Sequence, residues 1–442
     1  MVDSVKRGFQ ERDRPDAKIV QRCVRCGLCL PHCPTYLETL RETSSPRGRI
    51  HLIEAVERGQ LSLTDAGFVR QMYQCLDCRA CEAACPSGVE YGKLVEAARD
   101  QIERARPGNV LRRSLRWLLL ARLFGDMRLF RFFSRLLFYY QRSGLQWLAR
   151  RLGLLRLLRL AEMEQLLPAL PATFLVPHNQ HYEPAPASVE RSRPVPQVAL
   201  FAGCIMSTAF AETGRATLRV LQAHGCAVEL PAGQGCCGAL TVHAGDLEGA
   251  RRMARRNIEA FERSGLAFII VNAAGCGAAL KEYAHLLRDD PVYAERAAQF
   301  SARVRDVSEF LSEQPAPRQV RALPLRVTYQ EPCHLAHAQR ISKAPRQLLG
   351  RIPDLELREM NESSLCCGSA GIYNLTQPAM SRRLRARKIQ HTSATDAEIV
   401  ITANPGCQLQ LQSGLRQARS PMRVLHLVDL LDMAYGPDET AP

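Results

Sequence analysis

The chain has 442 residues, a formal net charge of +15 and 17 cysteines, and 46% of its residues are hydrophobic. This length predicts two or three domains, and the hydrophobic content is ordinary for a globular protein. The N-terminus lacks the apolar stretch of a secretory signal, and no apolar run is long enough to predict a transmembrane helix. The odd cysteine count without a signal favours metal binding or catalysis over disulfides.

Two cysteine blocks near the N-terminus, "CVRCGLCLPHCP" and "CLDCRACEAACP", share the spacing C-x2-C-x2-C-x3-C-P. This is the bacterial ferredoxin pattern for 4Fe–4S clusters, in which three close thiolates hold one cubane and the fourth, at a helix start, reaches the other. We therefore assign one cluster to Cys23, Cys26, Cys29 and Cys85. We assign the other to Cys75, Cys78, Cys81 and Cys33. Structural zinc is the alternative, although zinc sites usually pair two separated C-x2-C units.

The cluster domain is expected to span residues 1–106, with a helix in "RGRIHLIEAVERG" between the two blocks. Residues 107–195 follow as a helical, arginine-rich region and a proline-rich linker. Between residues 110 and 159 there are twelve arginines and one acid, a net charge of +11. One helix face there carries Arg128, Arg131, Arg135 and Arg142.

A basic amphipathic helix with many aromatic residues is typical of a membrane-surface segment, so residues 110–160 are a candidate for peripheral membrane contact. Burial against this protein or a partner subunit is an equally strong interpretation. The segment carries no nucleic-acid recognition motif, and we expect no nucleic-acid partner.

The rest of the chain is an internal repeat with a period near 130 residues, which predicts domains at 196–316 and 317–442. Each copy reads C-x31/32-CCG-x38/39-C. The first copy contains Cys204, Cys236, Cys237 and Cys276, and the second contains Cys333, Cys366, Cys367 and Cys407.

Apolar β-rich runs alternate with helical segments in both copies, which predicts a parallel α/β sheet in each. Most of these cysteines follow such runs, so we expect them to converge at the carboxyl ends of the strands. They are candidates for a further cluster or for redox thiols, and the alternative is that they hold no metal. Cys226 lies outside the pattern and is expected to be a small buried residue.

Two other patterns in the sequence do not predict a site. "GQGCCG" matches G-x-G-x-x-G, but two cysteines there would crowd a pyrophosphate. No other dinucleotide or flavin fingerprint is convincing, so no flavin is expected on this chain. His334 and His337 lie beside Cys333 and are expected to be hydrogen-bonded loop histidines.

Taken together, these residues resemble the iron–sulfur subunits of systems that oxidise glycerol 3-phosphate, lactate or glycolate, and the cysteine-rich subunit of heterodisulfide reductase. The resemblance is closest to the iron–sulfur subunits of glycolate oxidase and weakest from about residue 110 to 195. It is carried by "CPTY", "PRGRI", "CPSGVEYGKL", "GCGAALKEYA", "LCCGSAGIYNLTQP" and "ITANPGCQ".

The resemblance implies an electron-transfer subunit with two 4Fe–4S clusters and no catalytic residue of its own. An FAD-binding partner subunit would oxidise glycolate to glyoxylate, and membrane quinone would be the final acceptor. The subunit would lie peripherally on the cytoplasmic side of the inner membrane, and otherwise in the cytoplasm. Alternatives are an iron–sulfur subunit of a D-lactate or glycerol-3-phosphate dehydrogenase, a self-sufficient thiol–disulfide reductase using the CCG thiols, and an assembly module.

One departure from the heterodisulfide-reductase pattern concerns the fifth cysteine of each repeat, which is replaced by Ala273 and by Asn404. The remaining four cysteines per copy suffice for one ordinary cubane. Whether the repeats hold one or two further clusters is left open at this point. The expected fold is α+β overall: a helical ferredoxin-like domain, a basic helical linker and two tandem α/β cysteine-rich domains.

Overall fold

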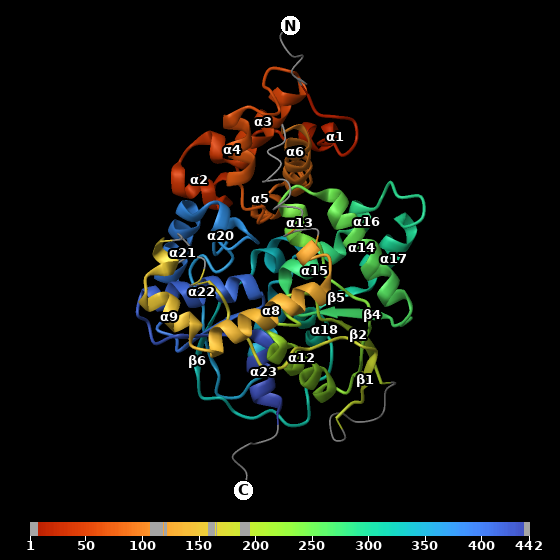
Figure 1. Ribbon diagram of the computed structural model, residues 1–442, viewed down its shortest axis with the longest axis vertical. Helices are drawn as coiled ribbons and strands as arrows, with labels where there is room; N and C mark the ends of the chain where they lie inside the picture. Colours follow the sequence, from red (N-terminus) through yellow and green to blue (C-terminus); the bar gives the residue numbers. More distant parts are fainter. Residues whose placement is uncertain are drawn as a thin grey trace.

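The computed structural model describes residues 8–106, 118, 122–157, 164, 166–185 and 195–436. Four of the twelve linker arginines, at positions 112, 113, 116 and 159, and residues 186–194 of the proline-rich stretch lie outside the described residues. Figure 1 shows a helical N-terminal domain at one end of the molecule and the two sheets at the other.

The N-terminal domain consists of short helices connected by the cysteine loops. Its helices are α1 (Ala17–Gln21), α2 (Pro34–Thr39), α3 (Pro46–Glu57), α4 (Ala66–Gln74), α5 (Ala80–Ala83) and α6 (Tyr91–Ala105), with 3-10 turns η1 (Leu30–His32) and η2 (Glu42–Ser44). The helix expected between the two cysteine blocks is confirmed as α3. The Ser45 side chain caps it by accepting from the Gly48 N–H, and Pro46 occupies its first position.

Apolar side chains on α3, α4 and α6 form the core of this domain, including Val56, Phe68, Met72 and Leu94. These side chains are essentially inaccessible to solvent. Burial of a large apolar side chain contributes about 1.5–3 kcal/mol. This core therefore holds the two cysteine loops at fixed positions on its surface.

The two repeats have the same sheet topology. The first sheet contains β1 (Gln180–Tyr182), β2 (Gln197–Phe201), β3 (Ala227–Leu230), β4 (Phe268–Val271) and β5 (Val304–Asp306), in the order β1-β3-β2-β4-β5. The second contains β6 (Arg326–Tyr329), β7 (Glu356–Arg358), β8 (Ile399–Thr402) and β9 (Arg423–His426), in the order β7-β6-β8-β9. All strand pairs are parallel except β1 with β3, so the predicted parallel α/β repeat is confirmed.

Strand β1 is an addition that the sequence did not predict, because it is three residues long and lies in the proline-rich stretch. It pairs antiparallel with β3, with Gln180 opposite Leu230. Part of the linker thereby forms an edge strand of the first sheet.

Helices surround and join the two sheets. The first repeat has α12 (Ala211–Ala223), α13 (Ala239–His243), α14 (Leu247–Glu262), α15 (Ala274–Lys281), α16 (Tyr283–Leu286), α17 (Ala294–Arg303) and α18 (Val307–Ser312). The second has the π-helical turn η4 (His334–Ala338), α19 (Lys343–Leu349), α20 (Tyr373–Thr376), α21 (Pro378–Ser393), α22 (Pro405–Gln417) and α23 (Leu427–Tyr435). One apolar cluster includes Leu221, Phe310, Leu348 and Leu431, so the repeats share a continuous core.

The described part of the linker forms α8 (Met127–Arg142), α9 (Leu145–Arg151) and α10 (Leu154–Leu157). Asp126 caps α8 by accepting from the Arg128 N–H at 2.8 Å. Figure 1 shows α8 lying across the repeats. Met127 and Phe130 pack beside the thiols of the first repeat. Among the described residues, no helix combines the length and apolar character needed to cross a membrane.

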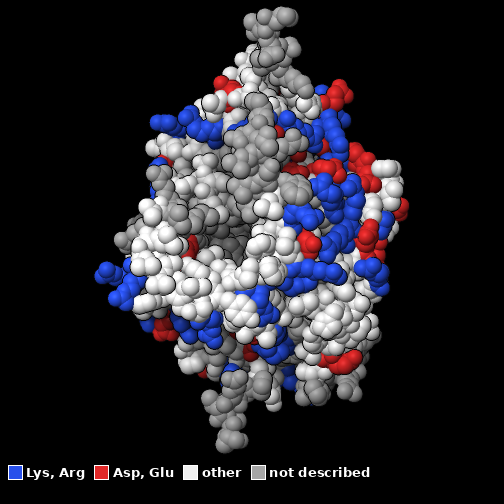
Figure 2. Space-filling model, in the orientation of Figure 1, with Lys and Arg blue, Asp and Glu red and all other residues white. Residues whose placement is uncertain are grey.

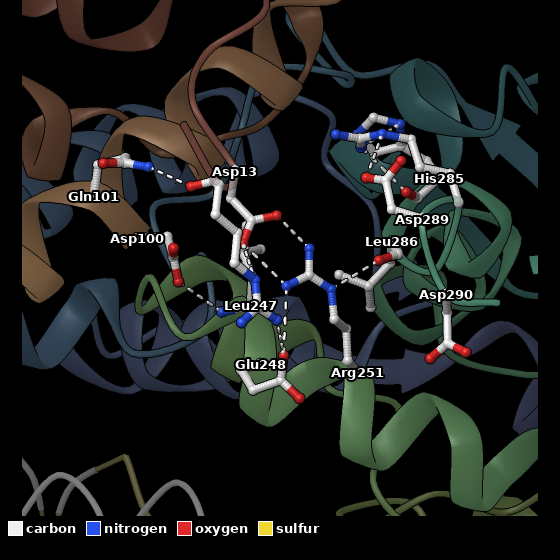
Figure 3. Close-up of polar contacts among 12 residues, drawn as sticks. Asp13, Asp100, Gln101, Leu247, Glu248, Arg251, His285, Leu286, Asp289 and Asp290 are labelled. Carbon is white, nitrogen blue, oxygen red and sulfur yellow. Dashed lines mark hydrogen bonds and ion pairs between the residues drawn. The ribbon is translucent and has the colours of Figure 1, made fainter. Parts of the chain in front are cut away.

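Asp13 connects the N-terminal domain to the first repeat (Figure 3). Its carboxylate lies 2.7 Å from the Arg104 guanidinium of α6 and accepts from Arg251 of α14. Nearby, Asp100 accepts from the Leu247 N–H at 3.0 Å. Burial raises the pKa of Asp13, but the two arginines outweigh that effect and lower it to about 2.

We expect Asp13→Asn to lower the free energy of unfolding by about 2 kcal/mol at neutral pH, because two charged hydrogen bonds are lost. The folded pKa lies below the unfolded value, so the stabilisation is complete above about pH 4 and is lost as the pH falls towards about 2. Denaturant unfolding of both proteins across this range measures the difference. Asp289→Asn, at a carboxylate that is 79% exposed, is the control and should change nothing. A difference that does not shrink on acidification contradicts the assignment.

Candidate functional site

Four cysteines of the N-terminal domain surround one small cavity between η1, α3 and α5. They are Cys33, Cys75, Cys78 and Cys81, the set that the ferredoxin pattern groups together. All four are buried. Cys33 is the N-cap of α2, as expected for a fourth ligand at a helix start. The structure thus brings this set together, and its role as a ligand set stays a prediction.

The other N-terminal set lies nearer the surface. Cys23, Cys26 and Cys29 lie between α1 and η1, and Cys26 is exposed. Cys85 is not at a helix start, contrary to the general ferredoxin pattern. It lies in a turn in which the Gly88 N–H donates to its carbonyl at 3.2 Å, and α6 begins only at Tyr91. Gly88 has a φ of +62°, a conformation that favours this extra turn before the helix.

A buried arginine accompanies the cavity. Arg49 is 1% exposed; its Nε donates to the Gln71 carbonyl at 2.9 Å, and its Nη1 lies 4.0 Å from the Cys33 sulfur. Thiolate ligands bring negative charge into the interior, and a fixed guanidinium offsets it. In the sequence, Arg49 had been noted only as part of the stretch "PRGRI", without a predicted role.

The thiols of the first repeat converge at the carboxyl ends of adjacent strands, as predicted. Cys204 follows β2, and its sulfur lies 3.7 Å from that of Cys236, which follows β3. The Cys237 sulfur lies 3.3 Å from that of Cys276 in α15, the helix that follows β4. Gly238 allows the sharp turn after the vicinal pair, with a φ of +85°.

The second repeat places its thiols in the same way. Cys366 contacts Cys333 and Cys367, and Cys367 also contacts Cys407. These thiols are largely buried and lie at the ends of β6, β7 and β8. Soft thiolate ligands in a buried site are the donor set that iron–sulfur clusters use, so both sets fit such a group chemically.

A charge difference separates the two repeats. Lys388 on α21 is 2% exposed and donates to the Ser363 carbonyl at 3.1 Å. Burial lowers the pKa of Lys388, whereas the neighbouring thiols of the second set oppose this effect. On the corresponding helix α14, Asn257 instead donates to the Cys236 carbonyl at 2.9 Å. A buried amine thus lies beside the second set, where the first has a neutral amide.

The two positions of the missing fifth cysteine lie together between the repeats. Ala273 is the N-cap of α15 and Asn404 is the N-cap of α22. The Asn404 amide donates to the Cys407 sulfur at 3.5 Å and accepts from the Gly275 N–H at 3.1 Å. An amide that links the repeats therefore stands where the five-thiolate pattern would have a thiol.

The cysteine set of the second repeat faces the buried set of the N-terminal domain. Cys78 packs in one apolar cluster with Cys333 and Cys366. Tyr373 of α20 donates to the Gln74 carbonyl at 2.9 Å, and His334 Nε2 donates to the Asp77 carbonyl at 2.9 Å. Hydrogen bonds from side chains of the second repeat to backbone carbonyls of the N-terminal domain thus fix the two cysteine sets against each other.

Asp77 is the centre of a buried charge network at this junction. Its carboxylate lies 3.0 Å from Arg79 Nε and 3.1 Å from His243 Nδ1. Burial raises the pKa of Asp77, but Arg79 and His243 outweigh it and the pKa falls well below its usual range. The His243 ring stacks on that of His334, with centroids 5.4 Å apart. Arg79 also pairs with Glu282 of the first repeat at 3.0 Å.

Both histidines of "PCHLAH" are hydrogen-bonded, as predicted, but they lie in the π-helical turn η4 and not in a loop. His337 Nε2 donates to the Ser364 carbonyl at 3.0 Å. Burial lowers the pKa of His334 to about 4, which keeps its ring neutral with Nε2 as the donor. Cys226 is fully buried in the shared core, which confirms its expected place there.

Comparisons with known proteins agree with this architecture. A family model described as a 4Fe-4S dicluster domain matches residues 19–89. The cysteine-rich domain model matches residues 198–281 and 327–412. A model for the linker region of the glycolate oxidase iron-sulfur subunit matches residues 111–167, the part where the resemblance in the sequence was weakest.

The sequence similarity to known proteins extends over nearly the whole chain. The "Probable glycolate oxidase iron-sulfur subunit" of Bacillus subtilis is 42% identical over 96% of this chain and 96% of its own length. The "Glycolate oxidase iron-sulfur subunit" of Escherichia coli is 33% identical over 94% of each chain. A fumarate reductase (CoM/CoB) subunit of Methanothermobacter marburgensis is 27% identical over 99% of this chain and 77% of that protein. The identity to these two glycolate oxidase subunits over nearly their whole length, together with the matched 4Fe-4S dicluster domain and cysteine-rich repeats, shows that this chain belongs to the family of glycolate oxidase iron–sulfur subunits.

Proposed function

We propose that this chain relays electrons from an FAD-bearing partner subunit, which oxidises glycolate to glyoxylate, towards a membrane quinone. The observation that carries the proposal is the packing of Cys78 against Cys333, which joins two thiol sets from different domains. When bound, iron–sulfur clusters accept and release one electron at a time. The thiols hold them and the surrounding charges set their potentials, while the substrate chemistry belongs to the partner's flavin.

We further propose which cysteines bind each iron–sulfur cluster. Cys23, Cys26, Cys29 and Cys85 hold one N-terminal cluster, and Cys75, Cys78, Cys81 and Cys33 hold the other. The second repeat holds a third cluster through Cys333, Cys366, Cys367 and Cys407. Its buried position against the second N-terminal set and the amine of Lys388 beside it support this assignment. The first repeat, with Cys204, Cys236, Cys237 and Cys276, offers a fourth site of the same donor chemistry.

Iron and acid-labile sulfide in the anaerobically purified chain test the assignment. Three cubanes give about twelve iron atoms per chain, and a fourth gives about sixteen. We expect Cys366→Ser and Cys33→Ser each to remove about four iron atoms. Cys226→Ala, which replaces a buried cysteine outside all four sets, should keep the full content. A count near eight that Cys366→Ser leaves unchanged contradicts the third cluster, and a zinc-only preparation contradicts the ferredoxin sites.

Substrate oxidation is expected to need the partner. The purified chain alone should not oxidise glycolate with a dye acceptor, whereas the complex with its flavoprotein should. D-lactate and glycerol 3-phosphate, offered to the same complex, test the alternative substrates. Glycolate oxidation, or reduction of a low-molecular-weight disulfide, by the isolated chain would show that it is not a relay but a self-sufficient enzyme.

The relay is proposed to lie on the membrane surface through α8 and α9. The outward side of these helices exposes Phe132, Phe133, Leu136, Tyr139, Trp147 and Leu148. Figure 2 shows this face as mostly uncharged, with basic side chains at its edges. Aromatic and leucine side chains beside arginines are typical of helices that lie in the membrane interface.

A vesicle-binding assay tests this surface with the whole complex. Replacement of both Phe132 and Phe133 by serine should weaken binding to vesicles rich in anionic lipid by about tenfold or more, because two aromatic insertions are lost. Arg128→Glu should weaken it most at low salt. Arg135 is a poor choice, since it donates to the Ala172 carbonyl at 2.6 Å. Val292→Ser, at an apolar residue 62% exposed elsewhere, is the control. Unchanged vesicle binding with loss of the flavoprotein would assign this face to subunit docking.

A further inference from the structure

A cavity of about 630 Å³ lies where the N-terminal domain meets both repeats. Helices α4 and α6 form one side, the end of α13 contributes His243 and Ala244, and α20 with the loop before it closes the other side. In Figure 1 these elements meet at the boundary between the N-terminal domain and the repeats. Its volume is in the range of cavities that bind small organic ligands.

The cavity lining is mainly apolar by area, and its polar groups include Arg70, Arg99 and His243. Val69, Leu76 and Ile372 supply aliphatic surface, and the Tyr73 and Tyr373 rings supply flat aromatic surface. A planar, uncharged ring is the ligand shape that such walls accommodate.

The polar groups of the cavity form a linked system. Tyr73 donates its hydroxyl hydrogen to the Glu103 carboxylate at 2.5 Å, and the Arg106 guanidinium lies 3.0 Å from the same carboxylate. Arg106 also lies over the Tyr73 ring, 5.4 Å from its centroid. Gln377 contributes an amide on the opposite side. The Gln377 amide and the guanidinium groups are donors suited to the carbonyl oxygens of an uncharged ligand, whereas the Tyr73 and Tyr373 hydroxyl hydrogens are already donated within the protein.

One wall of the cavity is Cys75, a proposed ligand of the second N-terminal cluster. Tyr373 reinforces this wall because its hydroxyl donates to the Gln74 carbonyl. A molecule in the cavity would therefore lie against the proposed cluster ligand Cys75, with none of the described residues between them.

We propose that this cavity binds an electron acceptor of the quinone class, a conclusion that rests on the proposed relay function. The quinone takes up two electrons, delivered singly past Cys75, and two protons from water at the cavity mouth, and becomes a quinol. The two electrons and two protons match those that oxidation of one hydroxy acid to its oxo acid releases on the partner. The site lies at the junction of three domains, where a ring held between the tyrosines contacts the cluster wall.

Binding of a short-chain benzoquinone to the full, oxidised chain, measured by isothermal titration, tests the site independently of glycolate oxidation. Thr376 on α20 lines the cavity and is exposed, so Thr376→Trp fills the space without disturbing the core. We expect this variant to bind the quinone at least about tenfold more weakly. The neighbouring Leu375 is 43% exposed and does not line the cavity, so Leu375→Trp is the matched control and should bind normally. Thr376→Ala should also bind normally, which separates filling of the cavity from loss of the hydroxyl.

A second readout is reoxidation of the dithionite-reduced chain. In Thr376→Trp, reoxidation by the quinone should slow about tenfold, whereas reoxidation by ferricyanide should keep its wild-type rate. Equal quinone affinity in Thr376→Trp and wild type overturns the proposal, as does an equal slowing with both oxidants. If the complex fails to oxidise glycolate but Thr376→Trp still slows reoxidation by the quinone and not by ferricyanide, the proposed relay function is wrong and the quinone site is supported.

Discussion

The arrangement of the molecule depends on Asp77, a buried carboxylate in the loop between two proposed cluster ligands. A charge in the interior is costly unless it is paired and hydrogen-bonded, and Asp77 obtains its partners from different parts of the chain. Arg79 comes from its own loop and His243 from the first repeat, while its backbone carbonyl accepts from His334 of the second. The carboxylate and the backbone carbonyl of this one residue together contact all three domains, and the same docked arrangement sets the buried thiols face to face.

The two repeats show how a duplicated scaffold becomes two different environments. Apart from the extra edge strand β1, their strand order is the same, and their vicinal cysteines occupy equivalent positions. Lys388 in one copy and Asn257 in the other give the two thiol sets different local charge. A positive charge favours added negative charge nearby, so Lys388 would ease reduction of a cluster held by the second set, while Arg252 and Arg256 line a pocket with Cys236 in the first repeat. Asn404 links the copies where a fifth thiol would otherwise stand.

Much of this architecture followed from the sequence, because spacing and periodicity are local signals. The cysteine spacing grouped Cys33 with Cys75, Cys78 and Cys81, and the structure places these four around one cavity. The repeat period predicted equivalent parallel sheets, which are observed. The turn after Cys85 escaped prediction because it depends on the left-handed conformation of Gly88. The sequence also did not predict the buried charges Arg49, Lys388 and Asp77. Their burial depends on segments that are distant in the sequence, so no local pattern indicates it. The cavity beside Cys75 exists only through domain docking and has no local signal.

Helix α8 covers part of the first thiol set, which bears on how that set could acquire a metal cluster. Met127 and Phe130 pack beside Cys204 and Cys236, and they belong to a linker segment rather than to the repeat itself. The linker then continues into β1, which is paired along the edge of the first sheet. The first thiol set therefore lies under part of its own chain. If this set holds the proposed fourth cluster, α8 covers the Cys204 and Cys236 side of it, so insertion of that cluster and docking of the linker would be coupled steps.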